Sequence, residues 1–432
     1  MNQSVLIDID ALRVGMFIQL EVGWMNHPFP MNSFRISTHE QIRVLRDLGL
    51  KSVRHIPAKS TALAQTPSEA PGRMADADMP PGPDDASEPA AERQGHGTTA
   101  HADVRAIFNA TQQRCRQRYQ EAATVYESVC AGVQAAPQEM REQAESLVRA
   151  CVAQLLEKGP CAVHLLADSL GQRSAGHAVN VLVLALLLGR SLRMEAQELC
   201  LLGAAALLHD LGKVGLPIHI AEPGAALSPS DMQRYQEHVG LSVDLGQRMG
   251  LSSDVLIAIA QHHEMADGSG FPLRLVGEDL SRCGQILALV NRYDRLCNPL
   301  HGEQALTPHE ALARIFALRR ECFDATVLGA FIRMMGVYPP GSLVQLVDGR
   351  FGLVVVVDAL HSLRPCVVLY EPAVPRDEAP LLDLAQNDEV GILRSLKPAQ
   401  LPRDALDYLL PRPRISYFFE RALSPRDCGG GA

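Results

Sequence analysis

The chain has 432 residues, of which 47% are hydrophobic and 5% aromatic, and its formal net charge is −9. This length predicts two or three domains, and the scattered acidic charge argues against a nucleic acid polymer as partner. Ten dispersed cysteines without a CxxC pair are typical of a reduced, cytoplasmic protein and exclude a disulfide framework or a zinc ribbon.

The first segment, residues 1–57, predicts a small N-terminal β-rich regulatory module with one helix. Its opening stretch alternates apolar and polar positions, STHEQIRVLRDLGL follows helical spacing, and KSVRHI is typical of a short strand. No basic region precedes an apolar core at the start, so we expect no secretory signal. Residues 58–102 are rich in Pro, Ala, Gly, Asp and Ser, which predicts a disordered linker.

The remaining chain predicts a helical region followed by strands. Residues 103–160 are polar and helix-prone, which favours a helical stalk that can support a homodimer. Residues 161–336 have the pattern of successive helices, and we expect an all-helical catalytic domain there. Its most apolar stretch, Val181 to Leu188, is too short to span a bilayer, so we expect a buried core helix and no membrane span. Residues 337–400 are Val-rich with period two and predict a small β module, and 401–432 predict a C-terminal tail.

Two histidine motifs carry the chemistry. His209-Asp210 lies in AALLHDLGKVGLP and His262-His263 lies in AQHHEMADGSGFP, and each motif ends an apolar helical run before a Gly-rich turn. Imidazoles and carboxylates at helix ends beside a loop are what a catalytic metal site needs. With His177 and His238 the chain has enough imidazoles for two divalent ions. The pattern therefore indicates metal-assisted hydrolysis of a phosphate ester.

Asp210 is the residue best placed to be shared between two ions. A charged side chain behind a run of Leu and Ala is costly unless it is paired or metal-bound. Adjacent helical positions diverge by about 100°, so His209 can hold one ion while Asp210 bridges two. Lys213, one turn later, can stabilise phosphate charge. These ligand types suit iron, manganese, zinc or nickel, and the sequence does not choose among them.

Each of these features also has a purely structural explanation. A single histidine such as His177 in an apolar helix is often a hydrogen-bonded core residue, and HDLGK can be a helix end capped by Gly212. Asn291 and Asp294 lie one helical turn apart, where they form either a site or an exposed helix surface.

The DGSG segment is similarly ambiguous. Gly268 and Gly270 permit a tight loop whose backbone amides can approach a phosphate. The alternative is an ordinary turn that is capped by Asp267.

The order of these motifs resembles the HD-GYP family, a branch of the HD-domain phosphohydrolases. The resemblance covers about residues 161–340, and residues 5–56, with LRVGMFIQLE and WMNHPF, resemble the uncharacterised module often found before such domains. The family is helical, typically binds two and sometimes three metal ions, and hydrolyses the bacterial second messenger cyclic di-GMP to pGpG and on to GMP. The resemblance thus implies a cytoplasmic cyclic di-GMP phosphodiesterase, with iron or manganese favoured over zinc or nickel.

The resemblance also implies individual roles. One ion would be held by His177, His209 and Asp210, and the other by Asp210, His238, His262 and His263. Asp210 and Lys213 would be catalytic, with Lys213 facing the scissile phosphate. The nucleotide, or a protein partner, would contact Asp267, Gly268, Gly270, Phe271 and Pro272.

The chain departs from the family pattern at several positions. Asn291 stands where the family usually has a metal-ligating Asp, which removes a negative charge and weakens the first metal site. Phe271 replaces the Tyr of the GYP turn, and Met265 stands where an Arg is usual. The basic element expected near Asn298-Pro299 is missing.

These departures keep other functions open. The leading hypothesis is hydrolysis of cyclic di-GMP. The second is a degenerate domain that binds cyclic di-GMP as a receptor, or binds a protein through the N-terminal module or the Gly270-Phe271-Pro272 turn. The third is a hydrolase of another nucleotide phosphoester.

Overall fold

The computed structural model describes residues 4–20, 33–36, 39–47, 50–60, 97–157, 159–166, 173–223, 226–300, 305–358, 360–387, 389–410 and 414–421. The chain divides into two compact units, Met1–Asn109 and Ala110–Ala432. Most of the expected linker, residues 61–96, lies outside the described residues.

The N-terminal unit combines a four-stranded sheet with one helix. Its elements are β1 (Val5–Asp8), β2 (Phe17–Gln19), β3 (Ser33–Arg35), α1 (His39–Asp47) and β4 (Ser52–His55). The strands pair in the antiparallel order β1-β4-β2-β3. The alternating sequence places Ile18 and Val53 on the buried face, where they pack with Leu45 of the helix. This unit thus has a small core of its own.

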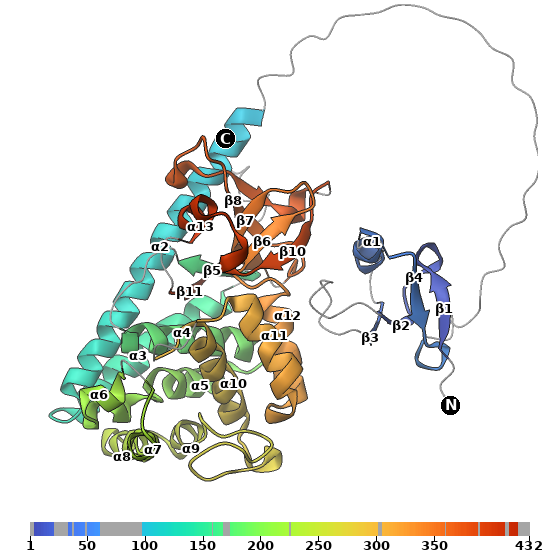
Figure 1. Ribbon diagram of the computed structural model, residues 1–432. Coiled ribbons are helices and arrows are strands. Elements are labelled where there is room, and N and C mark those ends of the chain that lie inside the picture. The colour runs from blue at the N-terminus through green and yellow to red at the C-terminus, as the bar shows by residue number, and fades with distance from the viewer. Residues whose placement is uncertain are drawn as a thin grey trace, which may run out of the picture. The chain divides into compact units, whose positions relative to one another are not determined.

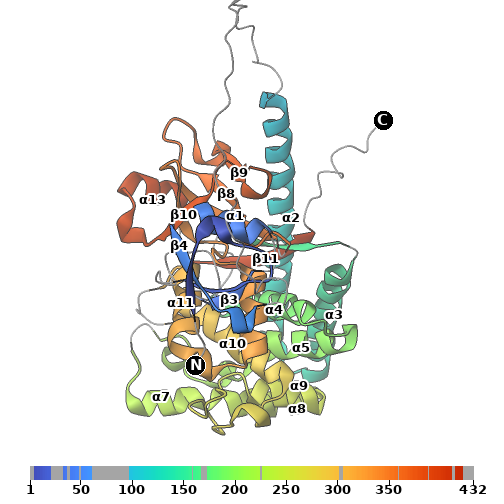
Figure 2. The same cartoon turned by 90° about the vertical axis from the view of Figure 1, so that its right-hand side faces the viewer.

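Helices form the body of the second unit. In chain order they are α2 (Gly97–Gly132), α3 (Pro137–Leu156), α4 (Arg173–Ser191), α5 (Ala196–Leu208), α6 (Ile218–Ala221), α7 (Pro229–Gln236), α8 (His238–Met249), α9 (Ser253–Ala260), α10 (Arg282–Cys297), α11 (Pro308–Arg319), α12 (Ala325–Met335) and α13 (Arg403–Leu409). Figures 1 and 2 show α4 to α12 gathered at one end and the strands at the other.

Helix α4 is the core helix around which the others pack. It contacts α5, α10 and α12, and it is apolar on every side from Val181 to Leu188, as a fully enclosed helix must be. By length and composition Ser174–Ser191 could cross a membrane, but 78% of that window is buried inside the protein. Its apolar sequence is therefore accounted for by packing within the fold.

The segment expected as a stalk instead packs along the second unit. Tyr119 of α2 is fully buried and donates to the carbonyl of Gly176 in α4 at 3.1 Å. Arg118 binds Glu420 at 3.0 Å, and α3 contacts α5 and α8. Val129 and Val133 of this segment are buried, and Figure 1 shows α2 beside both the helices and the strands.

One sheet joins segments that the sequence analysis placed apart. Its strands are β5 (Cys161–Leu166), β6 (Leu343–Leu346), β7 (Phe351–Asp358), β8 (Cys366–Leu369), β9 (Leu381–Asp383), β10 (Ile392–Leu396) and β11 (Ser416–Arg421). The order is β10-β6-β7-β5-β11, and β8 joins β7 to β9.

Two expectations are corrected by this sheet. Residues 161–166 are a strand and not part of an all-helical domain, and residues 403–421 are a helix and a strand instead of a tail. The run CAVHLL is short and apolar, so periodicity alone cannot separate a buried strand from a helix. Its strand identity comes from pairing with β7 and β11, which lie far away in the sequence.

Candidate metal centre and adjoining pocket

The helix packing brings His209 and Asp210 to the centre of the second unit. Helix α5 ends at Leu208, and a 3-10 turn over Leu211–Gly215 follows Asp210. Gly212 permits this turn to lie against α8, because a Cβ there would lie 2.2 Å from the carbonyl oxygen of His238 and 2.4 Å from the amide of Ser242. Its own amide donates to Ser242 Oγ at 2.8 Å. The small residue therefore holds the HD pair against the helix that carries the next histidine.

The predicted histidines converge on Asp210. His177 Nε2 and His209 Nε2 lie 3.6 Å and 3.4 Å from Asp210 Oδ2. On the other side, His238 Nε2 and His262 Nε2 lie 3.3 Å and 3.7 Å from Asp210 Oδ1. The structure thus brings together residues from α4, α8 and the ends of α5 and α9 around one carboxylate.

His263 completes the second group. One ligand atom from each of Asp210, His238, His262 and His263 lies within 4.8 Å of the others, and the same holds for His177, His209 and Asp210. The two groups share only Asp210. Each group could hold one metal ion.

Backbone carbonyls fix the protonation of three rings. His209, His238 and His262 direct Nδ1 at the carbonyl oxygens of Ala206, Tyr235 and Ile259, at 2.8, 2.5 and 2.6 Å. A carbonyl oxygen only accepts, so Nδ1 carries the proton and Nε2 of the neutral ring presents a lone pair. His177 is set similarly, since its Nδ1 lies 2.5 Å from Asp294 Oδ2.

These lone pairs face one another at short distance. His238 Nε2 lies 3.1 Å from His262 Nε2, and His177 Nε2 lies 3.2 Å from His209 Nε2. Two acceptors at such distances repel unless a cation lies between them. Orientation of a ligand ring by a carbonyl or carboxylate on its far nitrogen is also the usual arrangement at metal sites.

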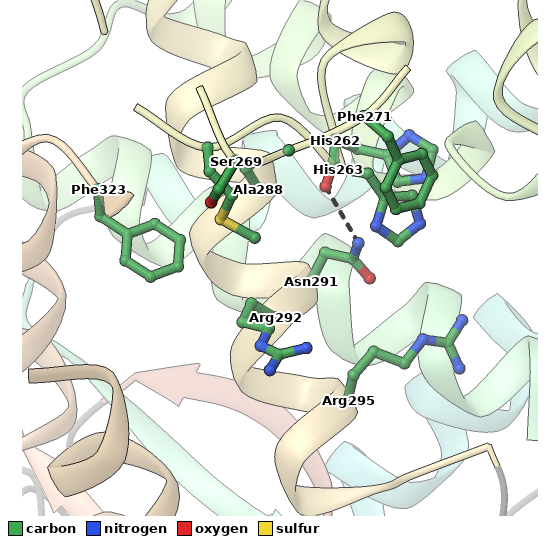
Figure 3. Close-up of a pocket in the computed structure, with 11 residues that line it drawn as sticks. His262, His263, Ser269, Phe271, Ala288, Asn291, Arg292, Arg295 and Phe323 are labelled. Atoms are coloured by element: carbon green, nitrogen blue, oxygen red, sulfur yellow. Dashed lines mark hydrogen bonds between the residues drawn. The ribbon is translucent and has the colours of Figure 1, made fainter. Parts of the chain in front are cut away.

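Asn291, which was expected to be a metal ligand, lies beside His177. Its Nδ2 donates to the carbonyl of His262 at 3.1 Å, which directs Oδ1 to 3.0 Å from His177 Nε2 (Figure 3). The oxygen is thus a third acceptor beside His177 and His209. It carries no full charge.

Burial favours the neutral form of four imidazoles, those of His177, His238, His262 and His263. Desolvation lowers the pKa of His177 to about 4 and that of His262 to about 3, outweighing the opposing effect of the nearby carboxylates. Desolvation also lowers the pKa of His238 and of His263. Neutral imidazole is the form that binds a metal ion, so these rings are ready for coordination at neutral pH.

The donor set fits divalent transition metals. Asp210 Oδ1 and His263 Nε2 are buried and have no hydrogen-bond partner among the described residues. Buried polar atoms are normally paired, and both atoms belong to the group with His238 and His262. A bound ion would satisfy both, and mixed imidazole and carboxylate ligands suit iron, manganese, zinc or nickel.

Two cationic side chains bind the other oxygen of Asp210. Lys213 Nζ lies 2.5 Å and Arg295 Nη2 lies 2.6 Å from Asp210 Oδ2. Burial acts to raise the pKa of Asp210, but Lys213, His209 and Arg295 hold it well below its usual value. The carboxylate is therefore ionised throughout the physiological range.

A pocket of about 200 Å³ adjoins the metal centre. Its wall is formed by His262, His263, Met265, Ser269, Gly270, Phe271, Ala288, Asn291, Arg292, Arg295 and Phe323. Figure 3 shows Asn291, Arg292 and Arg295 along α10, with Phe271 over His263. The Phe271 ring stacks on His263 with centroids 4.4 Å apart. The pocket thus combines apolar and cationic surface next to the imidazoles.

The predicted loop contributes only partly to this pocket. Gly270 and Phe271 line it, whereas Asp267, Gly268 and Pro272 do not. Asp267 caps its own turn by accepting from the Ser269 amide at 3.0 Å, as the structural alternative for DGSG predicted. Lys213 lies at Asp210 and is not among the lining residues.

Glu264 and Gly270 hold the loop in place. Glu264 is fully buried and accepts from the amides of Leu273 and Leu275 at 2.6 and 3.0 Å. At Gly270 a Cβ would lie 2.4 Å from the Met265 amide. Only glycine permits this close approach of the two backbones.

The sequence analysis left Asp294 open as a possible site residue and gave no role to the residues around it. Asp294 orients His177, and its second oxygen accepts from Asn180 at 2.8 Å and Asn298 at 2.9 Å. Arg295 binds the central carboxylate. The spacing of Asn291 and Asp294 was the available signal, but it gave no role to either Arg295 or Asn180.

Comparison with known proteins agrees with this geometry. Residues 160–327 match a family described as HD domain, and residues 4–144 match a domain of unknown function (DUF3391). The chain is 25% identical over 406 residues to the cyclic di-GMP phosphodiesterase PA4108 of Pseudomonas aeruginosa, covering 91% of this chain and 92% of that protein. It is 31% identical over 150 residues to the cyclic di-GMP phosphodiesterase response regulator RpfG of Xanthomonas campestris, covering 34% and 39%.

A solved structure is also similar. It is that of Bd1817, a HDG"Y"P protein from Bdellovibrio bacteriovorus, with 17% identity and a TM-score of 0.37, covering 76% of this chain and 98% of that chain.

Proposed function

The chain carries an HD domain of the HD-GYP family, and the domain of unknown function DUF3391 precedes it. We propose that the chain is a metal-dependent phosphodiesterase of cyclic di-GMP. The observation that carries this proposal is the set of facing Nε2 lone pairs around Asp210. The products would be pGpG, GMP or both, and the protein would act in the cytoplasm in bacterial second-messenger signalling.

The metal ligands would be divided between the two sides of Asp210. His177, His209 and Asn291 would hold one ion with Asp210 Oδ2, and His238, His262 and His263 would hold the other with Oδ1. Bound ions of this kind polarise phosphate oxygens and lower the pKa of a bound water, which supplies hydroxide at neutral pH.

The protein's own groups would position the substrate. Lys213 and Arg295, both on Asp210 Oδ2, place positive charge where a phosphate would approach the centre. Arg295 and Arg292 line the adjoining pocket, so they offer basic contacts in place of the element missing after Asn298. Phe271 offers a ring against which a purine can stack.

The direct test is a cleavage assay on anaerobically purified full-length protein. The protein is loaded with Mn²⁺ or Fe²⁺, incubated with cyclic di-GMP, and the products are separated by chromatography. We expect pGpG or GMP from the wild type and none from Asp210→Ala. His361→Ala is the matched control, because His361 is an exposed histidine paired with Asp358 outside the centre. Linear pGpG and other cyclic dinucleotides as substrates test the alternative that another phosphoester is hydrolysed.

A second candidate function is that of a cyclic di-GMP receptor. It is favoured by Asn291, which lacks the charge of a ligand carboxylate, and by Arg295, which lies on Asp210 Oδ2. Tight nucleotide binding by the metal-loaded protein without any product would support the receptor and contradict the phosphodiesterase.

A further inference from the structure

The two oxygens of Asp210 have different surroundings. Oδ2 is bound by both Lys213 and Arg295, at 2.5 and 2.6 Å. Oδ1 is buried and has no hydrogen-bond partner among the described residues, although His238 Nε2 lies 3.3 Å away. One oxygen is therefore neutralised by protein charges, while the other keeps its negative potential.

The Oδ1 side is built to take a cation. His238 and His262 present lone pairs to each other and to Oδ1, since their Nδ1 atoms donate to backbone carbonyls. His263 adds a buried Nε2 that has no hydrogen-bond partner in the part of the chain that the structure describes. The described residues place no cationic side chain on Oδ1, so nothing there competes with an ion for this oxygen.

The Oδ2 side is poorer in charge. His177, His209 and Asn291 offer ligand atoms without a negative charge. At Asn291 an amide stands in place of the usual carboxylate. The only anionic ligand atom in this group is Oδ2, and the guanidinium of Arg295 lies on it. A divalent ion here would have to share that oxygen with Arg295 and would be repelled by its charge.

Asp294 does not restore the missing charge. Its Oδ2 is taken by His177 Nδ1, and its Oδ1 accepts from Asn180 and Asn298. The carboxylate thus lies behind the His177 ring and faces away from the ion position. Its charge supports the ring but supplies no ligand atom.

We propose that the two sites are unequal: one divalent ion binds tightly to Asp210 Oδ1, His238, His262 and His263, while Arg295 supplies the positive charge at Oδ2 and leaves the His177, His209 and Asn291 site weak. This inference rests on the metal binding proposed above, and it is independent of which phosphoester is cleaved.

Metal binding is the test, with Mn²⁺ alone as the probe. Protein stripped with a chelator is titrated by calorimetry, and the metal retained after desalting is counted by mass spectrometry. We expect one tight equivalent in the wild type and a second equivalent bound about 100-fold more weakly. The electron paramagnetic resonance spectrum should be that of isolated Mn²⁺ at one equivalent, without the coupling of a metal pair.

Variants separate the two sides. Asn291→Asp combined with Arg295→Ala should bind two tight equivalents and show a coupled pair, because it restores a carboxylate beside His177 and removes one of the two positive charges on Oδ2, leaving Lys213 there. Arg292→Ala is the matched control, since Arg292 lies on the same helix and is not paired with Asp210 in the structure. We expect it to keep one tight equivalent.

Histidine variants locate the tight site. His209→Ala should retain the tight equivalent, and His238→Ala should lose it, with thermal melts showing that both variants fold. Two tight, coupled equivalents in the wild type, or a double variant that still binds one, would overturn the inference and leave the phosphodiesterase intact. Protein that binds no Mn²⁺ would overturn both.

Discussion

Asp294 Oδ2 lies 2.5 Å from His177 Nδ1 across the interface between α10 and α4. This pair determines which nitrogen of His177 faces the metal centre, because a carboxylate can only accept the Nδ1 proton. Asp294 Oδ1, the second oxygen of this carboxylate, accepts from Asn180 and Asn298, which also donate to the carbonyl of Ile415. The orientation of a predicted ligand thus depends on residues from both ends of the second unit.

Replacing Asp294 by Asn should reduce turnover about 10- to 100-fold. The amide of the new side chain can donate to Nδ1, which stabilises the opposite tautomer and places a proton on the Nε2 that must coordinate. The measurement is steady-state cleavage of cyclic di-GMP, with a thermal melt to show that the variant is folded. Unchanged turnover would mean that Asp294 does not set the tautomer of His177.

Asn298→Ala should affect stability more than chemistry. It removes the hydrogen bonds to Asp294 Oδ1 and to both backbone groups of Ile415, and we expect a loss of about 1–3 kcal/mol in the free energy of unfolding. Asn180 still pairs with Asp294, so turnover should fall less than in Asp294→Asn. A fall in turnover as large as that of Asp294→Asn, without a loss in the free energy of unfolding, would contradict this ranking.

Asp210→Ala should abolish turnover and remove the bound metal. Asp210 is the only residue common to both ligand groups, and its loss also leaves Lys213 and Arg295 without their shared partner. Cleavage assays and metal analysis of the same sample measure both effects. An Asp210→Ala protein with full activity would exclude the bridging role.

Two glycines, Gly212 packed against α8 and Gly240 exposed on α8, should respond in opposite ways to substitution by alanine. Gly212→Ala forces a Cβ to within 2.2 Å of the His238 carbonyl, so we expect displacement of the HD pair, loss of metal and a loss of stability of about 1–3 kcal/mol. Gly240→Ala places its Cβ in open space on α8 and should stabilise the helix by up to about 1 kcal/mol. Similar melting temperatures for the two variants would contradict the packing described here.

His164 should make folding sensitive to acid. It is buried in β5, neither ring nitrogen has a hydrogen-bond partner among the described residues, and desolvation lowers its pKa from 6.5 to about 4. Above pH 6.5 the ring is neutral in both states, so it costs nothing. As the pH falls from 6.5 towards 4, the unfolded chain binds a proton that the folded protein rejects, and stability is lost.

His164→Leu tests this acid sensitivity. Between about pH 7 and pH 4.5 the wild type should lose roughly 2–3 kcal/mol more than the variant, as the size of the pKa shift requires. Denaturant melts of both proteins at the two pH values measure the difference. Equal losses would show that His164 is protonated alike in the folded and unfolded chain.

The ligands were predictable because their signals are local. His209-Asp210 and His262-His263 stand at the ends of apolar runs, and the structure places both pairs at the ends of α5 and α9. Asn291 was assigned by resemblance to the family, and its oxygen does face His177. Sequence position and residue type were sufficient to predict that these side chains lie together.

The surroundings of the ligands were not predictable in the same way. Arg295 reaches Asp210 across 85 positions of sequence, and Asn180 reaches the amide of Tyr417 across 237. Such contacts depend on how helices and strands pack, and no short pattern encodes them. The strands β5 and β11 were missed for the same reason, since each is defined by its distant partner.

The pairing of β11 with β5 has a consequence for how the chain folds as it is synthesised. Ile415, just before β11, supplies the backbone groups that bind Asn180 and Asn298 behind the Asp294 carboxylate. A nascent chain that ends before Ile415 contains every predicted metal ligand. It lacks the backbone groups that hold Asn180 and Asn298 behind Asp294. The arrangement behind His177 therefore takes its final form only after residue 421 has been made and β11 has paired with β5.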